Sequence, residues 1–241
     1  MNISEYTETI INAFNQNGLG ALINEEKAKK LYDFSNLLVE TNKTFNLTAI
    51  TDEKEIILKH FVDCAAALKY IPQGSTLVDV GCGAGFPSLP IAILRDDVRV
   101  TALDSTAKKI NFINSAAEKL LITNILAVAG RAEDFAKSNR ESFDVSISRA
   151  VARLNILDEL CLPLTKIGGR FIAMKSSKGE EEYADALQGI SKLGGALIEK
   201  EKIALLFDDL SVDREIFVFS KANKTPSIYP RNYSQIAKKP L

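Results

Sequence analysis

The chain has 241 residues and a mass of 26.4 kDa, and 46 % of its residues are hydrophobic and 25 % charged. These values match globular domains and exclude a disordered chain, a collagen-like chain and a disulfide-stapled mini-protein. The 30 basic and 31 acidic residues give a net charge of -1, which neither favours nor excludes a nucleic-acid partner. Residues 221–241 contain five basic residues and no acid, which indicates a local contact with an anion.

Cysteine spacing and hydropathy predict the compartment. The three cysteines have no paired spacing with another cysteine or with histidine, so we expect neither a disulfide framework nor a metal site. The first ten residues contain two glutamates and no basic residue, unlike a secretory signal. The apolar stretch 80–94 is interrupted by glycine and proline and is too short to span a membrane. We therefore expect a soluble, cytoplasmic protein without a membrane segment.

The first 72 residues have a helical pattern. Tyr6, Ile10 and Phe14 recur at every fourth position, as they do on the buried face of an amphipathic helix. Asn24 precedes two glutamates, which is typical of a helix N-cap followed by an acidic first turn. We expect two or three helices here.

Beyond Pro72, short apolar runs alternate with helical stretches, which predicts an α/β fold with a mainly parallel sheet. Seven strands are expected at residues 76–80, 98–103, 125–129, 143–148, 170–174, 196–206 and 215–219. Helices are expected near residues 86–95, 106–121, 132–138, 153–164 and 180–192. The last two strands are separated only by a turn at 208–211, so the final strand should enter the sheet antiparallel. This arrangement resembles Rossmann-like methyltransferases more than dehydrogenases.

A glycine-rich loop follows the first predicted strand. Gly81, Gly83 and Gly85 lie where the chain must turn sharply and approach a ligand closely, just before a helix that starts near Phe86. Asp104 ends the next strand, 23 residues after Gly81, which is close to the spacing of a carboxylate that binds ribose hydroxyls. A tight turn that binds nothing is the alternative. The order of strand, loop, helix, strand and acid favours a nucleoside cofactor.

The spacing of the glycines distinguishes between cofactors. A dinucleotide fingerprint would place its third glycine at position 86, where this chain has Phe86. Asp79, just before the loop, would be unfavourable beside a pyrophosphate and favourable beside a sulfonium cation. It could also cap the amides of the loop. The loop therefore favours S-adenosyl-L-methionine over a dinucleotide.

Several further segments carry a more specific resemblance. They are residues 45–51 (FNLTAIT), 59–63 (KHFVD), 79–90 (DVGCGAGFPSLP), 104–105 (DS), 131–133 (RAE) and 148–152 (SRAVA). In this order they resemble the glucose-inhibited division protein B family, which are bacterial guanine-N7 methyltransferases of 16S small-subunit ribosomal RNA. The resemblance covers essentially the whole chain, including its basic end.

The strand pattern, together with the resemblance, implies a Rossmann-like class I methyltransferase sheet of seven strands with an antiparallel final strand. It divides the chain into a helical N-terminal cap (1–72), an S-adenosylmethionine-dependent methyltransferase domain (73–220) and a basic C-terminal tail (221–241). Asp104 would bind the ribose, and Ala132 and Glu133 the adenine. The cofactor-binding residues that it implies are Asp79, Gly81, Gly83, Gly85, Phe86, Ser88, Asp104, Ser105, Ala132, Glu133 and Arg149.

The implied reaction explains what the sequence lacks. Guanine N7 has a lone pair and no proton, so methylation requires no general base, and the chain has a single histidine. Arg149 would position the substrate by holding a phosphate or guanine O6. The sequence after the fourth strand lacks the Asn/Asp-Pro-Pro-Tyr segment that amino-group methyltransferases use. Cys161 lies in an apolar helical pattern and is interpreted as a core residue, and Cys82 as a steric substitute in the loop.

Other polar residues permit two interpretations. His60 and Asp63 lie one helical turn apart. They could form an oriented general base, but we favour a packed histidine whose hydrogen bonding is satisfied by the local carboxylate. Lysines at 108, 109, 175 and 178 are either solvated or contacts for RNA phosphates. The tail carries two tyrosines among its cations, which suits stacking on unpaired bases or a terminal segment docked on its own domain. The tail residues concerned are Lys224, Tyr229, Arg231, Tyr233, Lys238 and Lys239.

The sequence thus predicts a monomeric enzyme that methylates N7 of a guanine in 16S rRNA or in the assembling small ribosomal subunit, by in-line displacement. A small-molecule methyltransferase and a non-catalytic S-adenosylmethionine-binding module are the alternatives. A dehydrogenase is disfavoured by the glycine spacing.

Overall fold

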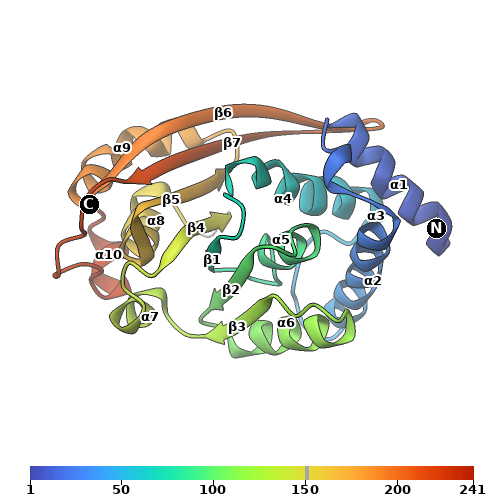
Figure 1. Cartoon of the computed structure of the whole chain (residues 1–241), viewed down its shortest axis with the longest axis horizontal. Helices are drawn as coiled ribbons and strands as arrows, with labels where there is room; N and C mark the ends of the chain where they lie inside the picture. Colours follow the sequence, from blue (N-terminus) through green and yellow to red (C-terminus); the bar gives the residue numbers. More distant parts are fainter. Residues whose placement is uncertain (150–151) are drawn as a thin grey trace.

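A seven-stranded sheet with the order β3-β2-β1-β4-β5-β7-β6 forms the centre of the computed structural model, which describes residues 1–149 and 152–241 (Figure 1). Its strands are β1 (Thr76–Val80), β2 (Arg99–Asp104), β3 (Ile125–Ala129), β4 (Phe143–Arg149), β5 (Thr165–Lys175), β6 (Gly195–Phe207) and β7 (Leu210–Lys221). The first five strands pair in parallel, and β7 pairs antiparallel with both β5 and β6. The predicted α/β fold with an antiparallel final strand is confirmed.

Helices cover both faces of the sheet. They are α1 (Ile3–Gln16), α2 (Glu25–Asn42), α3 (Glu53–Ile56), α4 (Asp63–Ala66), α5 (Ser88–Leu94), α6 (Ala107–Lys119), α7 (Ala132–Ser138), α8 (Leu154–Cys161), α9 (Gly179–Lys192) and α10 (Tyr233–Lys238). A π-helical segment, Ile57–Val62, joins α3 to α4. Successive residues of β1 point to opposite faces, so Leu77 packs with the α5 and α6 side and Val78 with the α8 side.

The N-terminal helices form as their sequences indicate. Asn24 caps α2, because its side chain accepts a hydrogen bond from the backbone N–H of Lys27 at 2.9 Å. Tyr6, Ile10 and Phe14 are buried on one side of α1. They belong to the same apolar cluster as residues of β1 and β4, so helices and sheet share one core. The predicted division of the chain at residues 72 and 220 stays a prediction.

The hairpin of β6 and β7 is longer than the sequence pattern indicates, since the final strand was expected only at 215–219. Its far end lies beside α1 (Figure 1). There the Asn17 side chain donates to the carbonyl of Leu206 at 2.7 Å and accepts from its N–H at 2.9 Å. These contacts stabilise the extension of both strands beyond the rest of the sheet.

The carboxyl ends of the parallel strands meet at one edge of the sheet, where open α/β sheets bind their ligands. The glycine loop follows β1 there, Asp104 ends β2 and Arg149 ends β4. Ala150 and Val151, which belong to the predicted 148–152 motif, lie outside the described residues. Within the described ranges, no helix is both long and apolar enough to cross a bilayer.

Candidate active site

The glycine loop takes its shape from backbone conformations that favour glycine. Gly81, Gly83 and Gly85 have φ angles of 77°, 58° and 94°. A Cβ atom at Gly83 would meet open space, whereas one at Gly85 would lie 2.6 Å from Leu89 Cδ1 in α5. Gly83 therefore leaves the backbone accessible from solvent, and Gly85 allows the loop to pack closely on the helix.

Asp104 joins this loop to the end of β2. Its Oδ2 accepts the backbone N–H of Gly83 at 3.0 Å, and its Oδ1 accepts the N–H of Thr106 at 2.8 Å. The ammonium of Lys109, in the first turn of α6, lies 3.9 Å from the same carboxylate. These contacts fix the orientation of the carboxylate at the carboxyl edge of the sheet.

Two hollows adjoin at Asp104, with volumes of about 250 and 330 Å³. The smaller lies toward β3 and is lined by Ser105, Thr106, Arg131, Ala132, Glu133 and Tyr233, among others. The larger lies toward the N-terminal helices and is lined by Leu47, Thr48, His60, Gly83, Phe86 and Arg149, among others. Gly81, Asp104 and Lys109 line both. An elongated ligand can therefore extend past Asp104 with one end in each hollow.

Most of the predicted cofactor-binding residues border these hollows. They are Gly81, Gly83, Phe86, Asp104, Ser105, Ala132, Glu133 and Arg149. Gly85, Asp79 and Ser88 do not line either hollow. The sequence does not separate the two groups, because the short segment 79–88 contains residues that line a hollow and residues that pack behind the loop.

Asp79 is fully buried behind the loop. Its Oδ2 accepts the backbone N–H of Ser88 at 3.0 Å, which caps the start of α5, and its Oδ1 has no partner among the described residues. Burial raises the pKa of this carboxyl to about 7, against the lowering effect of the hydrogen bond from the backbone N–H of Ser88. Asp79 therefore caps the first amide of α5 rather than the expected amides of the glycine loop, and a direct contact with a cofactor stays a prediction.

Arg149 connects the end of β4 to the N-terminal helices. Its Nη1 donates to the carbonyl of Lys59 and to Oδ2 of Asp63, both at 2.9 Å. Its Nη2 lies 3.2 Å from Nδ1 of His60, and its guanidinium carbon lies 5.3 Å from the centre of the Phe86 ring. Both terminal nitrogens therefore have partners within the protein. Its predicted role in positioning the substrate stays a prediction.

His60 is a packed histidine, as we favoured, but its partner is not the predicted carboxylate. Its ring stacks on Phe86 with 4.1 Å between centroids, and its Nε2 lies 3.1 Å from Oγ1 of Thr48. Asp63 instead binds two arginines, Arg149 and Arg214, one through each oxygen. Burial and the charge of Arg149 lower the pKa of His60 to about 3, so the imidazole is neutral at pH 7.

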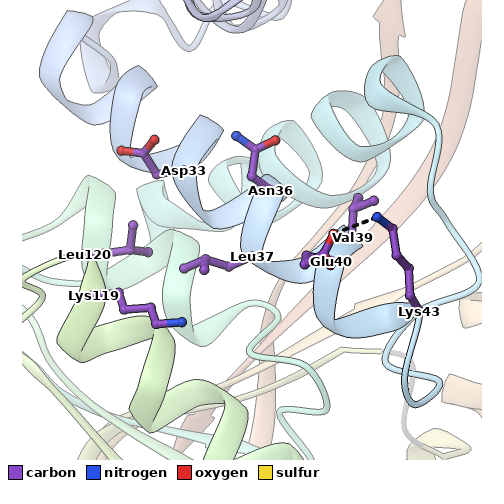
Figure 2. A pocket seen from close by; sticks show the side chains of 8 residues that line it. All are labelled: Asp33, Asn36, Leu37, Val39, Glu40, Lys43, Lys119 and Leu120. Carbon is purple, nitrogen blue, oxygen red and sulfur yellow. Dashed lines mark hydrogen bonds and ion pairs between the residues drawn. The ribbon is translucent and has the colours of Figure 1, made fainter.

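A hollow of about 670 Å³ lies elsewhere, between α2 and α6 (Figure 2). Leu37 and Leu120 line it, and the Lys43 ammonium in it pairs with Glu40 at 2.6 Å. Lys119, near the end of α6, lines this hollow. It lies about 15 Å along the helix from Lys109, which lines the two hollows at Asp104. None of the predicted site residues lines it.

Comparison with known proteins decides the family. A family model described as rRNA small subunit methyltransferase G (GidB) matches residues 27–203. A protein of that name from Clostridium botulinum is 42 % identical over 227 residues, which cover 92 % of this chain and 94 % of the relative. Another, from Desulforamulus reducens, is 44 % identical over 223 residues, covering 91 % and 92 %. The chain belongs to the rRNA small subunit methyltransferase G family. This confirms the resemblance seen in the sequence.

Solved structures of other methyltransferases share the fold of this family member. A putative methyltransferase from Bacillus halodurans superimposes with a TM-score of 0.53 and 14 % identity, covering 67 % of this chain and 99 % of that one. TYW2 from M. jannaschii, in complex with AdoMet, gives a TM-score of 0.52 and 15 % identity, covering 65 % and 74 %. At these identities the likeness shows a class I methyltransferase fold alone.

The C-terminal tail of this methyltransferase G family member is docked on its own domain through three of the residues considered for RNA binding, which are Tyr229, Arg231 and Tyr233. Tyr229 is buried, and Arg231 forms hydrogen bonds with both carboxylate oxygens of Glu159. Lys224, Lys238 and Lys239 are exposed. Lys221, counted with the tail in the sequence, ends β7 with its side chain fully buried.

Tyr233 lines the smaller hollow, a position that the sequence did not reveal. Its backbone N–H donates to Oε1 of Glu133 at 3.2 Å, and the guanidinium of Arg131 lies 5.6 Å from its ring centre. The tail thus forms one wall of the smaller hollow. The motif 131–133 indicated that these three residues belong to the site, but the sequence does not show that Tyr233 lies beside them, because its position depends on how the tail docks.

The remaining candidates divide between the interior and the surface. Lys175 is buried, donates to the carbonyl of Ala152 at 2.6 Å and pairs with Glu182 at 2.7 Å, so its ammonium has partners in the interior. Lys108 and Lys178 are exposed. Cys82 and Cys161 are buried, and burial raises the pKa of both thiols, which makes them poor nucleophiles. In the part of the chain that is described, no group of three or more potential ligands could hold a metal ion.

Proposed function

We propose that this chain transfers a methyl group from S-adenosyl-L-methionine to N7 of a guanine in 16S rRNA, as a monomer acting on the RNA or on the assembling small subunit. The observation that carries the proposal is the pair of hollows that adjoin at Asp104 on a class I methyltransferase fold. Membership of the rRNA small subunit methyltransferase G family supports the rRNA substrate.

The residues present fit the proposed cofactor. Asp104 presents a fixed carboxylate where a ribose would lie, and Gly83 offers backbone without a side chain toward the larger hollow. Ala132 and Glu133 in the smaller hollow would hold the adenine. When bound, the cofactor supplies a methyl group attached to a sulfonium sulfur. Phe86 at the end of the loop and the hollow beyond it leave room for the acceptor base.

The larger hollow suits an acceptor that needs no deprotonation. Guanine N7 attacks with a lone pair, so the chain has to orient the base and exclude water rather than remove a proton. His60, the one histidine of the chain, is neutral with both ring nitrogens hydrogen-bonded to the protein, which does not suit a general base. The geometry therefore supports in-line displacement in which positioning provides the catalysis.

Methyl transfer with the purified protein tests this proposal. The protein is incubated with methyl-labelled S-adenosylmethionine and either small subunits or their RNA from a strain that lacks the corresponding gene. Nucleoside analysis should find the label in 7-methylguanosine at one site. If the cofactor binds but neither RNA nor subunits acquire label, the proposal is wrong, and a small-molecule methyltransferase or a non-catalytic binding module takes its place.

A further inference from the structure

Thr48 lies at the rim of the larger hollow on a segment that one side chain holds in place. Oδ1 of Asn42 accepts the backbone N–H groups of Leu47 at 2.7 Å and of Thr48 at 3.0 Å. Nδ2 of the same amide donates to the carbonyl of Thr48 at 3.0 Å. The backbone at Thr48 is therefore fixed, and the residue lines the hollow. Neither its position in the segment 45–51 nor the proposed function so far gives it a role.

Hydrogen bonding around His60 assigns the proton of its neutral ring. An arginine has donors only, so Nη2 of Arg149, 3.2 Å away, requires that Nδ1 of His60 accept. The ring proton then lies on Nε2, which faces Oγ1 of Thr48 at 3.1 Å. His60 therefore donates to Thr48, and the direction of this bond is set by the fixed charge of Arg149.

The hydroxyl of Thr48 is left as a donor. Its oxygen also accepts the backbone N–H of Ile50 at 3.1 Å, so both of its lone pairs are used. Within residues 1–149 and 152–241, the hydroxyl hydrogen has no acceptor. Because Thr48 lines the larger hollow, a ligand there can accept this hydrogen.

We propose that Thr48 determines base specificity by donating its hydroxyl hydrogen to O6 of the guanine, an inference that rests on the proposed function. On the edge of the base that carries N7, guanine presents the acceptor O6, whereas adenine presents the amino group N6. An amino group would face Thr48 donor to donor, since the Thr48 oxygen has no lone pair left. Guanine is therefore accepted and adenine rejected through the substituent on C6, which lies beside N7 on the same edge of the base.

The contact should act on binding more than on the chemical step. Methylation at N7 makes the base cationic and withdraws electron density from O6, so the bond from Thr48 weakens as the reaction proceeds. An interaction stronger in the bound ground state than in the transition state lowers KM without raising kcat. Loss of the hydroxyl should therefore appear in KM and in base discrimination.

Steady-state methylation of RNA with defined bases tests this assignment. Thr48→Val removes the hydroxyl with little change of shape and should raise KM roughly tenfold, while kcat changes less than about twofold. Thr48→Ser should restore the wild-type KM. Thr44→Val is the matched control, because Thr44 lies just before the segment 45–51, is exposed and donates to the carbonyl of Thr41. Cofactor affinity measured by calorimetry should match the wild type in all three variants.

Discrimination is measured with a second RNA that carries 2,6-diaminopurine at the target position, which keeps N7 and replaces O6 with an amino group. The difference in N7 reactivity between the two bases is the same for every enzyme variant. The ratio of kcat/KM for guanine over diaminopurine should therefore fall about tenfold in Thr48→Val and stay unchanged in Thr44→Val. An unchanged KM and ratio in Thr48→Val, with guanine N7 still methylated, would overturn this inference alone.

The single histidine provides a test that does not depend on activity. Nitrogen-15 NMR of the imidazole should show a neutral ring protonated at Nε2 in the free protein. A ring protonated at Nδ1 would overturn the inference, since Thr48 would then donate to His60 instead of to a ligand. If the wild-type protein forms no 7-methylguanosine in rRNA, the proposed function itself fails and the O6 contact fails with it.

Discussion

The carboxylate of Asp104 accepts the backbone N–H of Gly83 at 3.0 Å, which ties the end of β2 to the glycine loop that follows β1. The same carboxylate borders both hollows. One side chain therefore shapes the loop and faces the place proposed for the ribose. The position of Asp104, the wall formed by Tyr233, the packing of Gly85 and the burial of Asp158 each lead to a testable prediction.

Asp104→Ala should weaken the binding of S-adenosylmethionine by roughly tenfold to a hundredfold. The substitution removes a charged acceptor for ribose hydroxyls and frees the N–H groups of Gly83 and Thr106. Titration calorimetry measures the Kd. Asp134→Ala is the control, because Asp134 pairs at the surface with Lys137. Equal affinities for the two variants would contradict the place assigned to Asp104.

Tyr233→Ala should weaken cofactor binding by roughly fivefold, because its ring and backbone form a wall of the smaller hollow beside Glu133. Tyr233→Phe should bind the cofactor like the wild type, since it keeps the ring over Arg131. Lys238→Ala changes an exposed residue of the same tail and is the control. The same calorimetric titration applies, and unaltered affinity in Tyr233→Ala would remove the tail from the cofactor site.

Gly85→Ala should lower the free energy of unfolding by about 3 kcal/mol, through both its φ angle of 94° and the clash of a Cβ atom with Leu89. Gly74→Ala is a matched comparison, because Gly74 has a φ angle of 70° and open space around it. Its cost should be about 1 kcal/mol from backbone strain alone. Denaturant unfolding measures both, and equal losses would show that the loop does not pack as described.

Asp158→Asn should stabilise the protein in a pH-dependent way. Asp158 is fully buried, and burial raises the pKa of its carboxyl to about 8 from its ordinary value of 3.8. A raised folded-state pKa gives stability that is fully present below about pH 4 and lost as the pH rises to about 8. The variant should therefore gain about 5 kcal/mol at pH 8, at about 1.4 kcal/mol for each pH unit between about 4 and about 8, and nothing below about pH 4.

Unfolding at several pH values measures this difference, with Asp96→Asn as the exposed control. A gain for Asp158→Asn that is equal at pH 4 and pH 8 would contradict the raised pKa of Asp158. Such a gain would not depend on whether the carboxyl is ionised.

The sheet could be predicted from the sequence because its signals are local. The bounds of β1 and β3 agree with the predicted ones, since each is a short apolar run between turn residues. The length of β6 and β7 could not be predicted in this way. Their extension depends on the pairing of Asn17 with Leu206, two residues 189 positions apart, which no periodic pattern indicates.

The candidate site was predicted in its parts rather than in its connections. The motifs marked Asp104, Glu133 and Arg149, and these residues do border the hollows. The expected partner of His60 was wrong because Asp63, one helical turn away, binds two arginines, whereas Thr48 approaches the ring through the packing of a separate segment. Such contacts depend on tertiary structure, which spacing alone does not determine.

The most direct test of the account is a map of 7-methylguanosine in 16S rRNA from a bacterial strain that lacks its own enzyme and expresses this chain. Nuclease digestion and mass spectrometry should find the modified base at one position with the wild-type chain and lose it with Asp104→Ala. If the expressed wild-type chain binds S-adenosylmethionine but the rRNA contains no 7-methylguanosine that depends on it, the central claim is contradicted.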